Sequence, residues 1–398
     1  MADIRSFLKE KEKREQNQEN YKVKIRRHRF SAFARVMMVL LVVGALTALV
    51  VIQYRNHIYT SYETVSSVAR ETGSGAEDVR LGNSVLTYSN DGAHCTDLKG
   101  NVVWNVTYGI QDILISINQD VVAIAEYNGR NVYVMNTQRQ LGSFSTTMPI
   151  RSIAVAATGN VGIYMADTNQ EIFKLYNPEG KELFEGKATM GDSGYPLSLS
   201  LSPNGELMGV SFIYLDAGVQ KTNIAFYNFG SVGDNQNDQL MGVHEKTDLL
   251  VPYIQYMNDS TAFAVGDSRL MIYQGSQKPM EAAQFLFDTE VRSVFYNEQY
   301  IGLVFYSDKT EARYKMNVYD TNATQVGSFY FDIDYTDIFF HNNTFTVYND
   351  SECMIMTMDG VEKFNGTFSK AVKKMVPLKS AYKYVILTND SLDTIQLK

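Results

Sequence analysis

The sequence has little cysteine, proline and tryptophan, and each shortage excludes a class of protein. Only two Cys occur in 398 residues, Cys95 and Cys353, so no disulfide framework holds the fold together. Seven Pro and 27 Gly exclude collagen-like and low-complexity sequence. One Trp stands against 26 Tyr and 21 Phe, whose rings favour strands and pack across them. The composition therefore indicates a β protein.

A long apolar run occurs once, near the start. Residues 36–52 read VMMVLLVVGALTALVVI, and with Gln53 and Tyr54 they reach the ~20 residues that a helix needs to cross a hydrocarbon core. Six Lys and Arg lie between positions 22 and 35, whereas Arg55 is the only one within about fifteen residues on the other side. The positive-inside rule then predicts a cytoplasmic charged tail at 1–35, a transmembrane helix at 36–54 and an extracytoplasmic remainder.

Two alternatives to an uncleaved, single-pass signal anchor remain open, namely a cleaved signal peptide and a buried core helix. The basic region is long for a signal peptide, the apolar run exceeds a typical h-region, and no small-x-small site ends it. The one-sided flanking charge opposes a core helix. We therefore expect a protein of the cell membrane, with a tail that is solvated and partly helical or that docks a cytoplasmic partner.

Charge is divided unevenly along the chain. Residues 1–35 carry 11 Lys and Arg against 5 Asp and Glu, which is +6, so from a total of −8 the remainder carries −14. An acidic body on the far side of a membrane is a poor partner for nucleic acid, and we expect no nucleic-acid binding.

Beyond residue 77 the sequence repeats about every forty residues, a period typical of β-propeller blades. A strand, a turn and a second strand recur as HCTDLKGNVVWNV, VYVMNTQRQLGSF, IFKLYNPEGKELF, LMIYQGSQKPMEAAQF, MNVYDTNATQVGSF and CMIMTMDGVEKF. One turn position is occupied by Asp97, Asn136, Asn177 and Asp320, and another by Gly100, Gly180 and Gly360. These are residues that tight hairpins use, Gly because it tolerates a positive φ.

An earlier apolar strand also repeats, since PIRSIAVAATGN at 149–160 matches EVRSVFYNEQY at 290–300. The repeats place blade starts near residues 77, 111, 150, 196, 251, 291, 336 and 372. The eighth blade has three strands before Lys398, and residues 62–70, YETVSSVAR, could supply the fourth. We therefore predict an all-β, eight-bladed propeller at 77–398, with seven blades as the alternative, preceded by a linker and possible ring-closing strand at 55–76. Residues 229–239 form a polar insertion in blade 4.

The segment DLKGNVVW, residues 97–104, resembles a blade-closing turn of quinoprotein-like (PQQ-like/WD40-like) propellers. The whole layout resembles uncharacterised single-pass membrane propeller proteins of Gram-positive bacteria. The resemblance implies that a quinone dehydrogenase of this type would dock its blades through repeated Trp and would bind pyrroloquinoline quinone with calcium in the channel. Here the Trp position holds Trp104 in blade 1, but Ser143, Phe184 and Phe364 in blades 2, 3 and 7. We therefore expect no enzyme activity, no cofactor and no metal site.

Other catalytic patterns are weak. GDSG at 191–194 resembles part of a chymotrypsin-type nucleophile motif, but no matching His motif precedes it, and a loop leading into a blade is expected there. The five His, at positions 28, 57, 94, 244 and 341, lack metal-ligand spacing.

One constellation of cations stands out when the blades are aligned at the start of their first strands. The equivalent positions, near one mouth of the channel, hold Glu77, Gln111, Arg151, Leu197, Pro252, Arg292, Thr336 and Lys373. Arg151, Arg292 and Lys373 could bind an anionic ligand in an otherwise acidic domain. The alternative is that these cations pair with Asp78, Asp112 or Asp337 and stabilise the ring.

The sequence thus predicts a membrane-anchored, extracytoplasmic propeller that acts as a non-catalytic protein-binding or scaffold module, with an envelope protein as its partner. An ectodomain that senses an anionic ligand is the second hypothesis. A quinone-dependent oxidoreductase is the third, and fold analogy alone does not support it.

Overall fold

The structure is a computed structural model that describes residues 2–71, 73, 75–168, 171–188 and 194–398. The chain divides into two units, Met1–Ile58 and Tyr59–Lys398. The first unit is one helix, α1 (Ala2–Asn56), which contains the apolar segment Arg35–Gln53, with a mean hydropathy of 2.7 and none of it buried. The charged tail, expected to be partly helical, is helical from Ala2, because Lys, Arg, Glu and Gln are strong helix formers.

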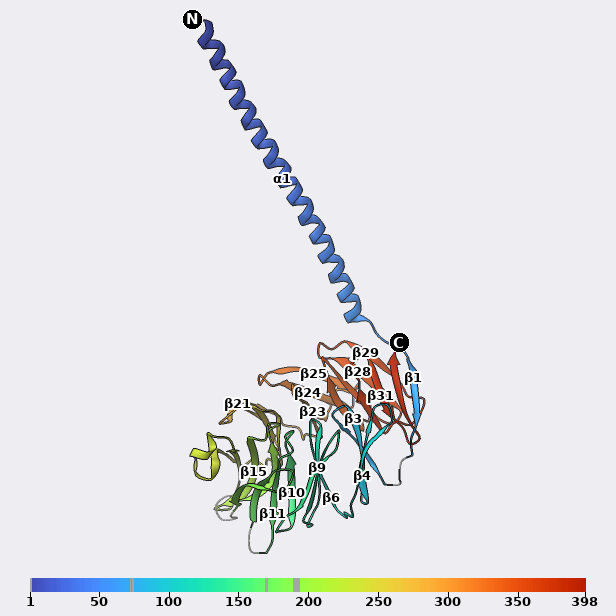
Figure 1. Cartoon of the computed structure of the whole chain (residues 1–398). Helices are drawn as coiled ribbons and strands as arrows, with labels where there is room; N and C mark the ends of the chain where they lie inside the picture. The colour runs from blue at the N-terminus through green and yellow to red at the C-terminus, as the bar shows by residue number, and fades with distance from the viewer. Residues whose placement is uncertain (1, 72, 74, 169–170, 189–193) are drawn as a thin grey trace. The chain divides into compact units, whose positions relative to one another are not determined.

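The second unit is an eight-bladed β-propeller, as predicted, and seven blades are excluded (Figure 1). Each blade is a four-stranded antiparallel sheet, and seven of the eight sheets consist of four strands consecutive in sequence. The first strands begin within two residues of the blade starts that the repeats predict. Hairpin connections of this kind keep the pairing of consecutive strands within one blade.

The first four blades follow chain order. Blade 1 comprises β2 (Glu77–Leu81), β3 (Ser84–Ser89), β4 (Gly92–Asp97) and β5 (Val102–Thr107). Blade 2 comprises β6 (Ile113–Asn118), β7 (Val121–Glu126), β8 (Asn131–Asn136) and β9 (Gln140–Ser145). Blade 3 comprises β10 (Ile150–Val155), β11 (Val161–Ala166), β12 (Glu171–Tyr176) and β13 (Glu182–Ala188). Blade 4 comprises β14 (Tyr195–Leu201), β15 (Leu207–Asp216), β16 (Val219–Asn228) and β17 (Leu240–Thr247).

The remaining blades continue to the last residues. Blade 5 comprises β18 (Tyr253–Asn258), β19 (Thr261–Val265), β20 (Arg269–Gln274) and β21 (Met280–Leu286). Blade 6 comprises β22 (Ser293–Tyr296), β23 (Tyr300–Tyr306), β24 (Tyr314–Asp320) and β25 (Gln325–Phe331). Blade 7 comprises β26 (Asp337–His341), β27 (Thr344–Tyr348), β28 (Glu352–Thr357) and β29 (Glu362–Thr367). Blade 8 comprises β30 (Lys374–Pro377), β31 (Lys383–Leu387), β32 (Ser391–Leu397) and β1 (Tyr62–Ala69).

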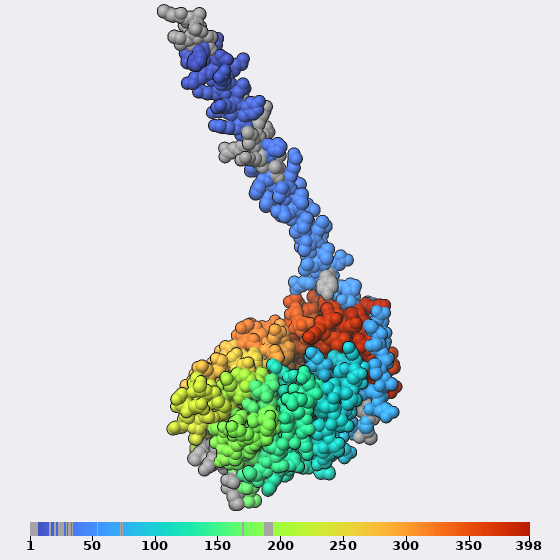
Figure 2. All heavy atoms as spheres, viewed as in Figure 1, coloured from blue at the N-terminus to red at the C-terminus, as the bar shows by residue number. Residues whose placement is uncertain are grey.

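The ring is closed by β1, which pairs antiparallel with β32 from Tyr62 opposite Leu397 to Ala69 opposite Ser391. This is the strand that residues 62–70 were expected to supply. Figure 2 shows the blue residues of β1 against the red C-terminal strands. Just before β1, the Tyr59 N–H donates to the Lys363 carbonyl at 2.8 Å and so joins the start of this unit to blade 7.

Burial follows the position of each strand within its blade. The second strands are buried on both faces, as in β7 (VVAIAE) and β11 (VGIYMA), because each is covered by the sheets of both neighbouring blades. The outer strands alternate between exposed and half-buried residues, as in β21. Cys95 and Cys353 lie in blades 1 and 7, and both are buried and free.

The DLKGNVVW segment forms the turn that was predicted from it. Asp97 Oδ1 accepts hydrogen bonds from the backbone N–H groups of Lys99 (2.9 Å) and Asn101 (2.8 Å), and Gly100 adopts φ 89°. The indole of Trp104 reaches blade 2, where Nε1 donates to the Asn136 carbonyl at 2.7 Å. Trp104 therefore docks one blade onto the next.

The alignment of Ser143 with Trp104 is wrong. In blade 2 the aromatic residue is Phe144, whose ring centroid lies 5.0 Å from that of Tyr176 in blade 3. Strand β9 carries the order Gly142-Ser-Phe144, whereas β13 carries Phe184-Glu-Gly186. Residues two apart in a strand share a face, so both orders place one glycine and one aromatic ring on the same face.

Blade 4 departs from the other blades in two places. The polar insertion contains two short 3₁₀ helices, η1 (Gly233–Asn235) and η2 (Asn237–Gln239). Strands β15 and β16 are also long, at ten residues each, and Leu215 near the tip of their hairpin is 75% exposed. The sequence predicted the insertion but not the long hairpin.

Candidate binding sites at the two mouths of the channel

The first strand of each blade lies on the inside of the ring, so the ends of these inner strands define the two mouths of the central channel. Inner strands of successive blades contact one another, as β10 contacts β6 and β14. Side-chain hydroxyls join some of them: Ser116 Oγ accepts from the Val155 N–H (3.0 Å), and Ser200 Oγ accepts from the Tyr256 N–H (2.9 Å). We call the mouth where inner strands begin the upstream mouth, and the mouth where they end the downstream mouth.

Arg151 lies at the upstream mouth, at an irregularity in the pairing of β10 with β11. Its Nη1 donates to Asn128 Oδ1 and, at 3.4 Å, to the Tyr127 hydroxyl. The guanidinium carbon lies 5.4 Å from the centroid of the Tyr127 ring. Both partners belong to the connection between β7 and β8, so Arg151 joins blade 3 to blade 2.

Arg292 lies on a cluster of tyrosines at the start of blade 6. Its guanidinium carbon is 5.0 Å from the Tyr306 ring centroid and 5.6 Å from that of Tyr314, and Nη1 donates to the Tyr306 hydroxyl. The Tyr314 and Tyr335 rings are 5.1 Å apart, edge to face. The Tyr314 hydroxyl donates to Asp334 Oδ1 at 2.7 Å, and burial together with this bond raises the pKa of Tyr314. We call Arg292, Tyr306, Tyr314 and Tyr335 the tyrosine surface, in which Arg292 and Tyr306 are exposed, Tyr335 is half-buried and Tyr314 is buried.

Lys373 is exposed at the start of blade 8. Asp337 and Asp78 were considered as partners of these three cations, but each pairs with another residue. Asp337 pairs with Lys374 and Asp78 pairs with Arg70, each at 2.8 Å. The cations at 151, 292 and 373 come from blades 3, 6 and 8, which are not neighbours in the ring. The upstream mouth therefore carries all three, but on separate blades.

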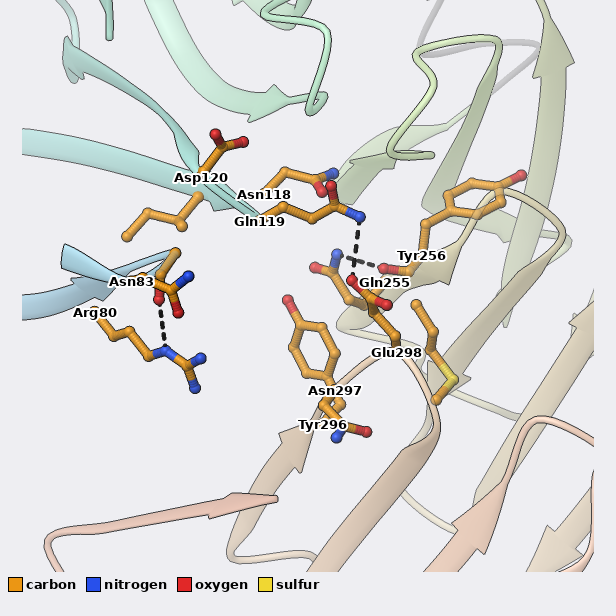
Figure 3. A pocket seen from close by; sticks show the side chains of 13 residues that line it. Arg80, Asn83, Asn118, Gln119, Asp120, Gln255, Tyr256, Tyr296, Asn297 and Glu298 are labelled. Carbon is orange, nitrogen blue, oxygen red and sulfur yellow. Dashed lines mark hydrogen bonds between the residues drawn. The ribbon is translucent and has the colours of Figure 1, made fainter. Parts of the chain in front are cut away.

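The downstream mouth contains a polar cavity of about 530 Å³, shown in Figure 3. Its walls are the ends of the inner strands, and the turns that follow them, in blades 1, 2, 5 and 6. The residues that line it include Arg80, Asn83, residues 117–120, residues 255–257 and residues 296–298. A cavity of this size lies within the range of small-ligand sites, roughly 300–1,000 Å³.

Hydrogen bonds connect blades across this mouth. Gln119 Nε2 donates to Glu298 Oε1 at 3.1 Å and so links blade 2 to blade 6. Asn118 Nδ2 lies 3.4 Å from the Leu201 carbonyl of blade 4, to which it donates. Figure 3 shows the Gln119–Glu298 bond at one side of the cavity, with Arg80 and Asn83 on the opposite side.

The charges that line the cavity nearly cancel, with Arg80 against Asp120 and Glu298. Arg80 Nε donates to the Gly82 carbonyl at 2.9 Å, and burial lowers the pKa of this guanidinium. Tyr296 is partly exposed, and burial raises its pKa to about 12. A tyrosine is neutral at physiological pH with or without this shift. The cavity therefore offers hydrogen-bonding groups with little net charge.

Sequence reasoning missed this cavity because it treated the segments after the first strands only as polar turns. The signal that could have indicated it is the recurrence of Asn and Gln there, as in Asn83, Asn118, Gln119 and Asn297. Asn also serves turns, as Asn297 does by accepting from the N–H groups of Gln299 and Tyr300. The pattern alone therefore did not separate a site from a turn.

The described residues show no arrangement suited to metal chemistry, since no three His, Cys, Asp or Glu side chains among them could hold a metal ion. Of the GDSG segment, residues 191–193 lie outside the described residues. Burial lowers the pKa of His94 and of His341, which lie in blades 1 and 7. The side chains at the two mouths can bind a ligand or a partner through hydrogen bonds, aromatic faces and single charges.

Comparisons with known proteins support the fold. Sqt1 from Chaetomium thermophilum has a TM-score of 0.53 at 11% identity, over 85% of this chain and 98% of that one. AztD from Citrobacter koseri has a TM-score of 0.50 at 9% identity, over 74% of this chain and 87% of that one. BamB from Moraxella catarrhalis has a TM-score of 0.47 at 10% identity, over 85% of this chain and all of that one. At these identities the likeness to Sqt1 and AztD shows the fold alone, which is a β-propeller.

No curated protein matches the sequence. One family model does, and it covers residues 55–397, which include the closing strand and all eight blades. The chain therefore belongs to the family described as "Family of unknown function (DUF5711)".

Proposed function

We propose that this protein is a membrane-anchored, extracytoplasmic β-propeller that acts as a non-catalytic, protein-binding scaffold at the cell envelope. The observation that carries the proposal is the tyrosine surface at the upstream mouth. Tyr and Arg are enriched among the residues that dominate protein–protein binding energy. Here Tyr306 is 57% exposed beside the exposed Arg292.

The tyrosine surface is also held rigid before any partner binds. The Tyr306 and Tyr314 rings stack with centroids 5.8 Å apart, and the Ser293 hydroxyl lies within hydrogen-bond distance of the Tyr335 hydroxyl, at 2.8 Å. Side chains fixed in this way lose little rotamer freedom on binding, which costs about 0.5–1.5 kcal/mol for each flexible side chain.

The membrane anchor is supported by α1. Its segment Arg35–Gln53 is unburied and long enough to span a bilayer, and the basic residues before it favour a cytoplasmic N-terminus. We therefore propose the cell membrane as the location, with the propeller outside the cytoplasm. Alkaline phosphatase fused after Lys398 should be active in cells, because it folds only outside the cytoplasm; an inactive fusion that is present at full length would reverse this orientation.

Site-specific photo-crosslinking tests the scaffold function. A photoreactive amino acid at Tyr306 in the full-length protein should crosslink one reproducible protein partner in intact cells. The same amino acid at Ser145, on the outer strand of blade 2, serves as the matched control. The Arg292→Ala variant should weaken the Tyr306 crosslink. Absence of any crosslink specific to position 306 would contradict the proposal.

A second candidate function is sensing of an anionic ligand through Arg151, Arg292 and Lys373. It is favoured by the exposed Lys373 and Arg292 at one mouth of an otherwise acidic domain. Inorganic phosphate should then raise the unfolding temperature of the native protein, and Arg151→Ala with Arg292→Ala should abolish the rise. Addition of pyrroloquinoline quinone and calcium should give no dye-linked dehydrogenase activity under either function.

A further inference from the structure

The polar cavity at the downstream mouth is separate from the tyrosine surface, because the two lie at opposite ends of the inner strands. Four blades contribute its walls, so a bound molecule would be contacted from opposed sides of the channel. Its volume of about 530 Å³ suits a ligand of several rings better than a single ion.

Five of the thirteen residues that line the cavity are amides. Asn83, Asn118, Gln119 and Gln255 each carry a carbonyl oxygen that accepts and an NH₂ group that donates. Gln255 is the most informative, because it lies within β18 and, among the residues that the structure describes, its Nε2 donates only to the adjacent Tyr256 carbonyl, at 3.0 Å. A turn-forming role does not explain an amide in the body of a strand.

The charged side chains that line the cavity narrow the class of ligand that it can bind. One guanidinium and two carboxylates line the cavity, and one of the carboxylates, Glu298, already accepts a hydrogen bond from Gln119. This balance gives no basis for holding a phosphate or a polyanion, which would need several convergent cations. A neutral ligand that both donates and accepts hydrogen bonds matches it.

Tyr296 adds an apolar face to these polar groups. Its ring is partly exposed and packs against the Phe263 ring, with centroids 5.6 Å apart. An aromatic ring held by an edge-to-face contact in this way can cover the C–H face of a flat, hydroxylated ring, while the amides bond the hydroxyl groups at its edge.

We propose that the downstream mouth binds a neutral, polyhydroxylated ligand of the sugar class. Gln255 and Asn83 bond its hydroxyl groups from opposite walls of the cavity, and Tyr296 packs against one ring. The proposal does not depend on the protein-binding function of the tyrosine surface.

Saturation-transfer NMR on the full-length protein in lipid nanodiscs tests it, since nanodiscs avoid competition from sugar-headed detergents. The probes are cellobiose, maltose and N,N′-diacetylchitobiose, with glucose 6-phosphate as the anionic comparison. We expect transfer to at least one neutral disaccharide and a weaker signal from glucose 6-phosphate. Sedimentation with cellulose or chitin then shows whether a polymer-linked sugar binds as the free sugar does.

Variants locate the binding. Gln255→Leu keeps the side-chain size and removes the amide, and we expect at least a tenfold loss of affinity for the disaccharide that binds. Asn83→Ala, in an exposed turn, gives a second variant if Gln255→Leu does not fold. Gln111→Leu, at the upstream mouth, is the matched control and should bind normally. No transfer to any neutral probe, transfer to glucose 6-phosphate alone, or binding unchanged in both Gln255→Leu and Asn83→Ala would overturn the proposal.

Discussion

At the scale of single residues, Gly100 has two independent reasons to be glycine. Its φ of 89° lies in the left-handed region, and a Cβ there would lie 2.7 Å from Cγ1 of Val68 on the closing strand. Gly360 occupies the same turn position in blade 7 with φ 83°, but a Cβ there would meet nothing within 4 Å. The two glycines therefore share the conformational constraint and differ in the contact.

This comparison gives the first prediction. Gly360→Ala should destabilise the propeller by about 1–2 kcal/mol, the cost of a left-handed conformation for a residue with a Cβ. Gly100→Ala should cost more, because Val68 must also move away. Thermal unfolding followed by Trp104 fluorescence measures both variants. Equal unfolding temperatures would show that the contact with β1 contributes nothing.

The sequence predicts the role of a residue correctly where a few neighbouring residues determine that role. Asp97 and Gly100 satisfy the chemistry of one turn, so their roles follow from a few neighbouring residues. Ser143 was assigned wrongly because the turn in blade 2 is one residue shorter: the Asn136 N–H bonds the Arg139 carbonyl, whereas the Asp97 N–H bonds the Asn101 carbonyl. Counting from the first turn residue therefore passes the equivalent position by one, and Gly142 lies opposite Val134 as Trp104 lies opposite Cys95. The amide of Gln255 escaped notice because its exposure to the channel depends on how blades pack.

At the scale of elements, β1 is the strand on which closure depends. An ion pair fixes its end: Arg70, one residue after β1, pairs with Asp78 of β2, and the two side chains are 14% and 2% exposed. Asp78 Oδ1 also accepts from the Thr87 hydroxyl at 2.7 Å. Residues 59–70, which we call the closing segment, are therefore bonded to blade 1 as well as to β32.

The second prediction concerns this ion pair. Arg70→Met should cost about 3–5 kcal/mol, because it leaves the buried carboxylate of Asp78 without its partner. The double variant Arg70→Met/Asp78→Leu should recover much of the loss. Lys398→Met, which breaks an exposed pair with Glu63, is the control and should cost at most about 1 kcal/mol. Chemical denaturation measures all of these, and a small effect of Arg70→Met alone would contradict the expectation.

Most elements followed from the sequence because strand alternation and turn residues are local signals. The first strands of all eight blades begin where the repeats place them, to within two residues. The long hairpin of β15 and β16 was not predicted, since its extra residues continue the pairing pattern and no turn residue separates them from the regular strand. Helix α1 continues through the charged tail, where composition had indicated only partial helix.

At the scale of the whole molecule, the ring closes next to a buried thiol. Cys353 lies in a core cluster of blades 7 and 8, against which Tyr59 and Tyr62 of the closing segment pack. Cys95 lies instead at the junction of blades 1 and 2, with Sγ 3.8 Å from the Thr137 carbonyl. Burial raises the pKa of both thiols, so neither reacts readily in the closed ring.

Eight blades and closure by an N-terminal strand could be predicted because a ring needs complete sheets, and the last blade was one strand short. The downstream cavity could not, because its walls come from blades 1, 2, 5 and 6, and their distances across the channel depend on every blade angle between them. The upstream cations could be placed at one mouth by alignment, but their partners could not.

The reaction rates of the two thiols, Cys353 and Cys95, report how the ring opens. Tyr59→Ala removes a ring that packs against Tyr382, with centroids 4.8 Å apart, and should make local release of the closing segment easier. If release costs 1.4 kcal/mol less, Cys353 should react with a maleimide about tenfold faster, since its exposure follows the population of the open form. Cys95 should keep its rate, because the junction of blades 1 and 2 stays intact. Mass spectrometry of labelled peptides distinguishes the two thiols. Equal acceleration of both would mean that the ring unfolds as one unit, and that the closing segment has no separate opening.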